Sequence, residues 1–269
     1  MDFTLNTYSA LLKVLLREYK FLTFSNFIEN KTVNSSSNDN VVILRHDVDR
    51  LPQNSLTTAK IENELGIKGT YYFRIVPESF DKEIIKQIAD YGHEIGYHYE
   101  DIDLTIQNSK FKIQNSSAKD KLIELAYESF CKNLETMREF ANIKTICMHG
   151  SPLSKFDNKL LWEKFDYRKL GIIGEPYLDI NWNEFGYLTD TGRRWDGISV
   201  RDKVKRNAPA IINERFKSTY DIIDNIEKLP PKLMITVHPE RWKDNLFSWS
   251  KQIVLQNVKN IVKRFIVKV

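Results

Sequence analysis

The chain of 269 residues has little cysteine, no long uninterrupted hydrophobic run and only a small net charge. Its two cysteines, Cys131 and Cys147, lie in a helical pattern and a strand pattern, which argues against a disulfide framework and against a thiolate metal site. The N-terminal stretch MDFTLNTYSALLKVLLREYKF carries charges that interrupt any apolar core, so it is predicted to be an amphipathic helix rather than a signal peptide or membrane span. The cytoplasm is therefore the expected location.

The net charge of +4 is too small to indicate binding to nucleic acid. The stretch from Lys251 to Val269 is locally asymmetric, with five basic residues, no acidic one and apolar residues at helical spacing. The favoured interpretation is a last helix that closes the barrel and has a solvated face. Peripheral membrane contact through this basic helix is the alternative.

Short apolar segments alternate with helical patterns along the chain, which is typical of a parallel sheet wrapped by helices. The length suits one domain over residues 1–269, in which residues 1–40 form a flanking helix and polar loop. The pattern predicts a deformed or incomplete (β/α) barrel, with an open doubly wound sheet as the alternative. Strands are expected at Val41–Arg45, Thr70–Ile75, Glu94–Tyr97, Thr145–Met148, Gly171–Ile173, Tyr187–Thr189 and Leu233–Val237. Helices are expected at Ser55–Leu65, Lys82–Tyr91 and Ala118–Phe140.

Histidine is concentrated at the ends of the expected strands. Four of the five histidines end one, namely His46, His98, His149 and His238. Because functional sites in parallel α/β folds lie at the carboxyl ends of strands, this placement favours a functional site there. His93 precedes its strand at the opposite rim and is expected to be structural.

The motif RHDVDR places Asp47 and Asp49 two residues apart, so their side chains share a direction in a strand. One carboxylate of such a pair can hold a divalent cation while the other acts as a base. In YGHEIGYHYED, His98 and Glu100 offer an imidazole and a carboxylate, both of which are zinc ligands in proteins.

A second group of polar and aromatic residues occurs in YLTDTGRRWDG and VHPERW. Arg194, Trp195 and Trp242 could form a sugar-binding wall, in which the indole rings stack on a pyranose. A salt-bridged loop is the alternative interpretation.

The motifs RHDVD, GHEIGYH, MHGSP, DTGRRW and ITVHP occur in this order between Val41 and Trp242. In this order they resemble the NodB-homology polysaccharide deacetylases, and more closely the WbmS-type branch associated with surface-polysaccharide synthesis. The resemblance implies a deformed (β/α) barrel and metal-dependent hydrolysis of an N-acyl group, with acetyl expected, on a small-molecule amino sugar. The sequence leaves open whether that sugar is nucleotide-linked, lipid-linked or polymeric.

On the matching positions, the resemblance implies that Asp47 is the general base and that His238 is the general acid. It makes Asp49 and His98 ligands of a divalent metal, with Zn²⁺ expected and Co²⁺ or Ni²⁺ as alternatives.

Two positions depart from the family pattern. Ile102 stands where the family carries a second metal-binding histidine, and His149 ends the strand where the third motif offers an arginine. Either His149 or Glu100 could supply the missing ligand, and His149 is favoured because it approaches from a separate strand. A chain without metal would be a non-catalytic carbohydrate-binding protein, and an amidohydrolase acting on a non-sugar C–N bond is also open.

Overall fold

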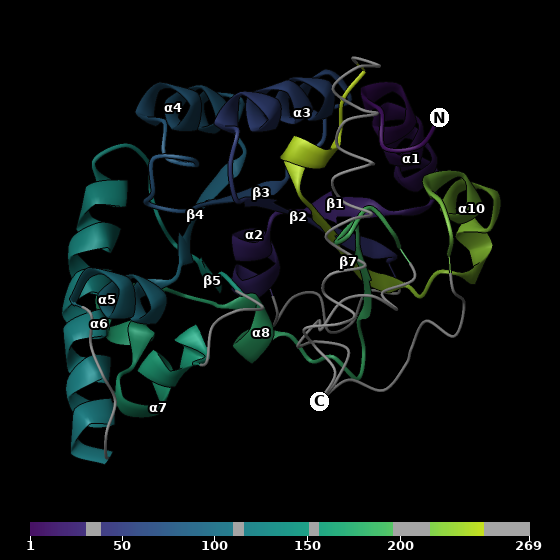
Figure 1. Cartoon of the computed structure of the whole chain (residues 1–269). Coiled ribbons are helices and arrows are strands. Elements are labelled where there is room, and N and C mark those ends of the chain that lie inside the picture. Colours follow the sequence, from purple (N-terminus) through teal and green to yellow (C-terminus); the bar gives the residue numbers. More distant parts are fainter. Residues whose placement is uncertain (31–38, 110–115, 151–155, 196–215, 245–269) are drawn as a thin grey trace, which may run out of the picture.

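Seven parallel strands form the centre of the molecule (Figure 1). The structure is a computed structural model and describes residues 1–30, 39–109, 116–150, 156–195 and 216–244. The strands are β1 (Lys20–Leu22), β2 (Val41–Val48), β3 (Thr70–Phe73), β4 (Glu94–Tyr99), β5 (Ile146–Met148), β6 (Gly186–Thr189) and β7 (Lys232–Val237). Their order in the sheet is β5-β4-β3-β2-β7-β6, and β1 pairs with the first residues of β2.

The sheet curls into a half-barrel whose edge strands, β5 and β6, are not paired with each other in the described part of the chain. The mixed α/β architecture with a parallel sheet is confirmed, and the curled half-barrel is compatible with the expected deformed or incomplete (β/α) barrel. Six of the seven expected strands are present. The strand expected at Gly171–Ile173 is wrong, because Gly171 has a φ of 75° at the end of a 3-10 helix and the segment makes a single bridge, between Thr145 and Gly174.

Helices surround the sheet. They are α1 (Leu5–Glu18), α2 (Phe24–Glu29), α3 (Pro52–Glu64), α4 (Lys82–Asp90), α5 (Asp101–Ser109), α6 (Ser116–Arg138), α7 (Leu161–Lys164), α8 (Pro176–Asp179) and α10 (Thr219–Asp224). Short 3-10 helices are η2 (Asn158–Leu160), η3 (Tyr167–Leu170), η4 (Ile226–Lys228) and η5 (Pro239–Arg241). The expected helices at α1, α3, α4 and α6 are confirmed to within a few residues. The sequence analysis missed β1, α2 and α5.

Alternation along the strands sends side chains to two different environments. On β2, Val42 and Leu44 face outward into the hydrophobic cluster that contains α1, whereas Ile43 faces inward. Inside the curl, Ile43 and Tyr72 pack with Phe24 from α2. A Cβ at Gly96 would overlap the Tyr72 ring, so glycine is required for this inner packing. The interior of the half-barrel is thus filled by apolar side chains toward the amino ends of the strands, and polar side chains lie at the carboxyl ends.

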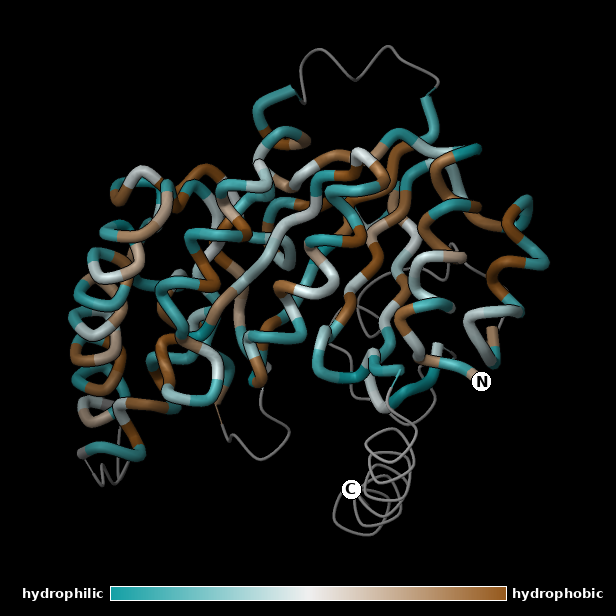
Figure 2. The backbone as a smooth tube through the Cα atoms, turned by 90° about the horizontal axis from the view of Figure 1, so that it is seen from above, coloured by the Kyte–Doolittle hydropathy of each residue, from teal (hydrophilic) through white to brown (hydrophobic). Residues whose placement is uncertain are grey.

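The described part of the N-terminal segment contributes to the hydrophobic core. Helix α1 buries Tyr8, Leu11, Leu12 and Leu15, and β1 joins the sheet. Viewed from above, the tube in Figure 2 alternates between hydrophobic and hydrophilic positions along the peripheral helices, as helices with one face toward a sheet should.

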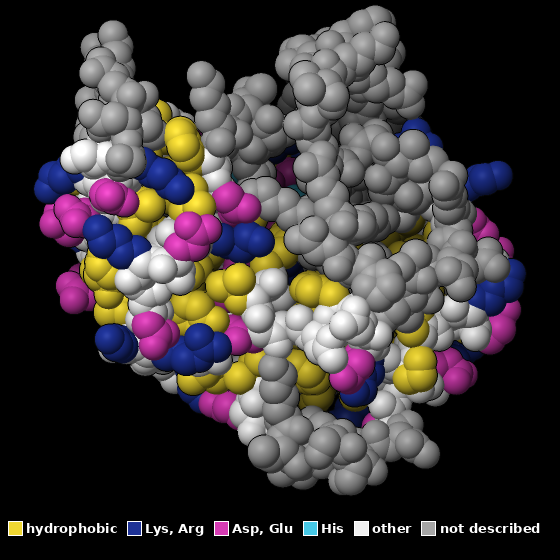
Figure 3. Space-filling model, turned by 90° about the horizontal axis from the view of Figure 1, so that it is seen from below, with side chains coloured by type: hydrophobic (Ala, Val, Ile, Leu, Met, Phe, Trp, Pro, Cys, Tyr) yellow, Lys and Arg dark blue, Asp and Glu magenta, His cyan; other side chains and the backbone are white. Residues whose placement is uncertain are grey.

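The described surface has mixed charge. On the face shown in Figure 3, lysine and arginine side chains are interspersed with acidic ones. Among the described helices, none is both long and apolar enough for a bilayer span. The basic segment from Lys251 to Val269 lies outside the described residues.

Candidate metal centre

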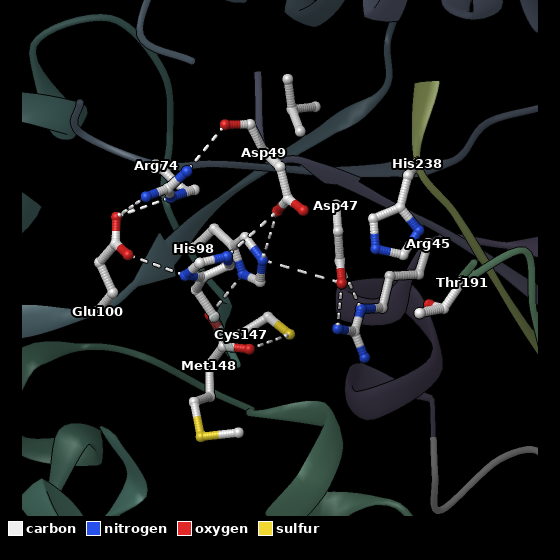
Figure 4. A network of polar contacts seen from close by, with 12 residues as sticks. Arg45, Asp47, Asp49, Arg74, His98, Glu100, Cys147, Met148, Thr191 and His238 are labelled. Carbon is white, nitrogen blue, oxygen red and sulfur yellow. Dashed lines mark hydrogen bonds and ion pairs between the residues drawn. The ribbon is translucent and has the colours of Figure 1, made fainter. Parts of the chain in front are cut away.

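The polar residues at the carboxyl ends of the strands follow the pleat of the sheet. Counting in steps of two from the inward-facing residues of each strand places one set of side chains inside the curl. That set comprises Arg45 and Asp47 on β2 and His98 on β4, together with the residues that directly follow five strands, namely Asp49 after β2, Arg74 after β3, Glu100 after β4, His149 after β5 and His238 after β7. Figure 4 shows the labelled members of this set converging on one region.

Three of these side chains form a group that could hold a metal ion. One ligand atom each from Asp49, His98 and His149 lies within 4.8 Å of the others. Oδ1 of Asp49 is 3.5 Å from Nε2 of His98 and 3.6 Å from Nε2 of His149. Two imidazoles and a carboxylate that approach from three strand ends fit a divalent ion such as Zn²⁺, Co²⁺ or Ni²⁺.

Hydrogen bonds on the far side of each ring orient the two imidazoles. Nδ1 of His98 lies 2.9 Å from the carbonyl oxygen of Cys147, and Nδ1 of His149 lies 2.8 Å from Oε2 of Glu100. Because a carbonyl and a carboxylate oxygen only accept, both Nδ1 atoms donate, which leaves Nε2 as the ring atom of each histidine that faces Asp49. Metal-binding histidines in proteins have this arrangement.

The carboxylate of Asp49 also fits a bound cation. Its Oδ1 atom is buried and has no hydrogen-bond partner among the described residues, although it lies between the two Nε2 atoms. Burial raises the pKa of Asp49, but His149, His98 and His238 lower it to well below its usual range. A carboxylate facing two imidazole Nε2 atoms is a donor set that a cation would complete.

A second group of potential ligands overlaps the first, because Asp47, His98 and Cys147 also lie within 4.8 Å of one another. This group fits an ion less well. Both carboxylate oxygens of Asp47 already accept from Arg45, and burial raises the pKa of the Cys147 thiol well above its usual value. The group of Asp49, His98 and His149 is therefore the better candidate.

Asp47 lies beside the metal group and is held by Arg45 from the same strand. The guanidinium donates from Nε to Oδ1 at 2.8 Å and from Nη2 to Oδ2 at 2.6 Å. Burial raises the pKa of Asp47, but Arg45 and His98 lower it by more than burial raises it. The pKa is therefore below its usual value, and the carboxylate is ionised at neutral pH. Oδ2 is also 3.8 Å from Nε2 of His98, which places the carboxylate next to the candidate ion position.

His238 completes the inner rim at the end of β7. Its backbone N–H and its Nδ1 both contact the carboxylate of Asp190, at 3.0 and 2.6 Å. Arg241 and the indole N–H of Trp242 donate to the same carboxylate, at 2.9 and 2.8 Å. Burial and Arg241 lower the pKa of His238, but Asp190 raises it by more, so the net direction is upward. His238 is therefore held in one orientation as a buried imidazole that protonates readily.

Ile102 provides no ligand. Its side chain is fully buried in the hydrophobic cluster formed by β4, α5 and α6. The side-chain oxygen of Asn158 caps the start of α5 by accepting from the backbone of Ile102 at 2.9 Å. The Nδ2 atom of Asn158 donates to the carbonyl oxygen of His149 at 3.3 Å. His149, just after β5, stands with Asp49 and His98 in the candidate group, and Glu100 lies behind it as a hydrogen-bond partner.

His46 does not belong to this site, although it also ends a strand. As the neighbour of Arg45 and Asp47 it faces outward, where Nε2 contacts Glu62 at 2.9 Å and Tyr8 at 3.0 Å. His93 lies in the same outer region and accepts at Nδ1 from the backbone of Gly69. The structural role expected for His93 agrees with these contacts, whereas the grouping of His46 with the other three histidines was wrong.

The proposed aromatic sugar-binding wall is not formed. Trp195 and Trp242 are each 1% exposed, and both rings pack on Phe3 at centroid distances of 6.1 and 5.1 Å. Their indole N–H groups donate to Thr219 and Asp190. Arg194 is half-buried in the loop before Trp195. Both tryptophans belong to the hydrophobic cluster around α1, where burial removes the large apolar surface of the indole rings from water.

Three residues of the site were not predicted from the sequence, and only Arg45 has a purely local signal. Arg45 lies two residues before Asp47, so strand alternation alone places it on the same face. Asp190 follows β6, which neighbours β7 only through the sheet order. Arg74 follows β3 at the same parity as Tyr72, but its role depends on contacts with two other strands.

Comparisons with known proteins do not add to this site: no family model matches the chain, and no curated protein matches it.

Proposed function

We propose that the protein is a metal-dependent hydrolase that cleaves the amide of an N-acylated amino sugar, as the resemblance to NodB-homology deacetylases implies. The observation that carries the proposal is the convergence of a three-ligand group with Asp47 and His238. Such a site combines a cation position, a base and an acid, which are the parts that amide hydrolysis needs.

The residues divide the work according to their contacts. Asp49, His98 and His149 would hold the ion, which when bound would polarise the amide carbonyl and acidify a water molecule. Asp47, fixed by Arg45 and ionised, would accept the proton of the attacking water. His238 would donate a proton to the departing nitrogen, because an amine leaves readily only when protonated.

Asp190 supports the acid role of His238. Its carboxylate contacts Nδ1, which leaves Nε2 as the proton-donating atom, and it raises the pKa of the ring. A carboxylate in this position fixes both the ring orientation and the proton position, as in other acid–base histidines.

A second candidate is an amidohydrolase acting on a non-sugar C–N bond. The burial of Trp195 and Trp242 favours it, since the feature that suggested a stacking surface for a pyranose is part of the core. The same burial weakens the interpretation as a non-catalytic carbohydrate-binding protein. The residues of the site support hydrolysis of an amide, whereas a sugar as the substrate is supported by the motif resemblance.

Metal analysis combined with an amine-release assay tests the proposal. The purified chain should retain about one divalent ion, and a panel of nucleotide-linked N-acetyl sugars and non-sugar amides should identify the substrate. Asp49→Asn and Asp47→Asn form a matched pair on one strand. Asp49→Asn should lose both ion and activity, whereas Asp47→Asn should keep the ion and lose activity.

Three outcomes would contradict the proposal. An ion retained in both Asp49→Ala and His98→Ala would remove the ligand assignment. Full activity in Asp47→Asn would remove the base. Sugar binding that survives chelation, without amine release from any amide in the panel, would favour the binding protein instead.

A further inference from the structure

Arg74 lies next to the candidate metal centre and donates hydrogen bonds to the side chain of Glu100 and to the backbone of Asp49. The guanidinium donates from Nε to Oε1 of Glu100 at 2.7 Å, and Nη2 lies 2.5 Å from the same oxygen. Its third nitrogen, Nη1, donates to the backbone carbonyl of Asp49 at 2.9 Å. Figure 4 shows this guanidinium between Glu100 and the main chain at Asp49.

Glu100 passes this connection to His149. Its Oε1 atom is occupied by Arg74, and its Oε2 atom accepts from Nδ1 of His149 at 2.8 Å. Both oxygens of the carboxylate are therefore committed to neighbours, and the Glu100 side chain is 7% exposed. Arg74, Glu100 and His149 form a continuous chain of charge-assisted hydrogen bonds.

The backbone of His149 is anchored, because the N–H donates to the carbonyl of Tyr99 at 2.9 Å and the carbonyl accepts from Asn158 at 3.3 Å. The ring packs edge-on against the ring of His98 and faces Asp49 through Nε2 at 3.6 Å. On the other side of the ring, the Nδ1 contact with Glu100 is its one short hydrogen bond among the described residues. Loss of Arg74 would thus loosen the restraint on the ring from that side but leave the strand in place.

We propose that Arg74 is a positioning residue of the metal centre, which sets the placement of Asp49 and His149 relative to each other. This inference rests on the proposed metal-dependent function. The planar guanidinium suits the task because its three nitrogens have fixed directions. A second consequence is that Glu100, on the same face as His98, is kept out of the ligand sphere, because its two oxygens are already bonded.

Co²⁺ binding to the full chain tests the proposal without using activity. Affinity is measured by competition with a chelator, and X-ray absorption gives the number of imidazole nitrogens on the ion. Arg74→Gln should bind Co²⁺ about 10–100-fold more weakly than wild type, the range for loss of an outer hydrogen-bond partner. Arg74→Lys should also bind weakly, since one ammonium group lacks the fork that bonds Glu100 and the Asp49 carbonyl together.

A double variant separates positioning from general stability. If Arg74 acts through His149, then Arg74→Gln should have little further effect on Co²⁺ affinity in a His149→Ala background. The control is Arg168→Gln. Arg168 does not belong to the site, and its Nη2 atom lies 2.6 Å from Oδ1 of Asp179. The control variant should bind Co²⁺ as wild type does.

Each result decides the inference. Unchanged Co²⁺ affinity in Arg74→Gln would overturn the positioning role and leave the proposed function standing. An equal loss of Co²⁺ affinity with and without His149 would overturn the inference, because Arg74 would then not act through the placement of His149 relative to Asp49. Failure of the wild-type chain to bind Co²⁺ would overturn the proposed function and this inference together.

Discussion

Arg45→Met tests the energetics of the site without any knowledge of the substrate. The side chains of Arg45 and Asp47 are 1% and 8% exposed, and two hydrogen bonds of 2.8 and 2.6 Å join them. Removing the arginine leaves a carboxylate in the interior without its partner, which costs about 3–5 kcal/mol. Methionine keeps much of the length of the side chain, so the loss of packing is small. We expect the free energy of unfolding at pH 7 to fall by this amount.

The cost should depend on pH in a defined direction. In the wild type, Arg45 keeps the folded pKa of Asp47 below the unfolded value of about 3.9. That contribution to stability is present above this value and is lost as the pH falls through the folded pKa. In Arg45→Met, burial, which is already the largest influence on this pKa, is no longer offset by Arg45, and we expect the folded pKa to rise above the unfolded value. Ionisation then destabilises the variant, so its deficit should grow from about pH 4 to pH 7.

Urea denaturation followed by far-UV circular dichroism measures both effects. The matched control is Arg45→Met in an Asp47→Asn background, where no charge is left behind. The arginine substitution should cost about 1–3 kcal/mol less there, as expected for directly contacting partners. An equal cost in both backgrounds, or a deficit that does not change between pH 4 and pH 7, would refute the reasoning.

Three further predictions concern other residues. In Asp190→Asn, the pKa of His238 should fall because Asp190 no longer raises it, so the alkaline limb of the rate of amine release should move to lower pH; an unmoved limb would contradict the acid role. Ile102→Ala should lower the free energy of unfolding by about 2–5 kcal/mol and leave Co²⁺ affinity unchanged, as chemical denaturation and metal titration would show. Burial raises the pKa of Asp101 to about 6, above its unfolded value of about 3.9, so this group destabilises the wild type as the pH rises through that window. Asp101→Asn should lack this loss, and identical pH dependence of the two unfolding curves would contradict it.

Strand alternation explains most of what could be predicted about the site. Once β2 is assigned, RHDVD places Arg45, Asp47 and Asp49 on one face and His46 on the other. The sequence contained this information, but the position of a histidine at a strand end does not reveal its face. His46 was therefore grouped with the site because it follows an apolar run, although its side chain lies on the other face of the sheet.

Register and packing decided the rest. His149 meets Glu100 because β4 and β5 pair so that His98 lies beside Cys147. Arg74 reaches both of its partners because β3 lies between β2 and β4. Likewise, a tryptophan next to charged residues in the sequence can belong either to a binding surface or to the core. Trp195 and Trp242 belong to the core because α1 packs over them.

The sequence by itself determined the parallel α/β architecture and the reactive residues at the carboxyl ends of strands, because periodicity and chain order are local properties. Only the tertiary structure decided that His149 rather than Ile102 stands with Asp49 and His98, and that Glu100 supports the ring. The physical reason is that ligand geometry depends on distances between strands far apart in the chain. Those distances are set by sheet order and register, which no single segment encodes.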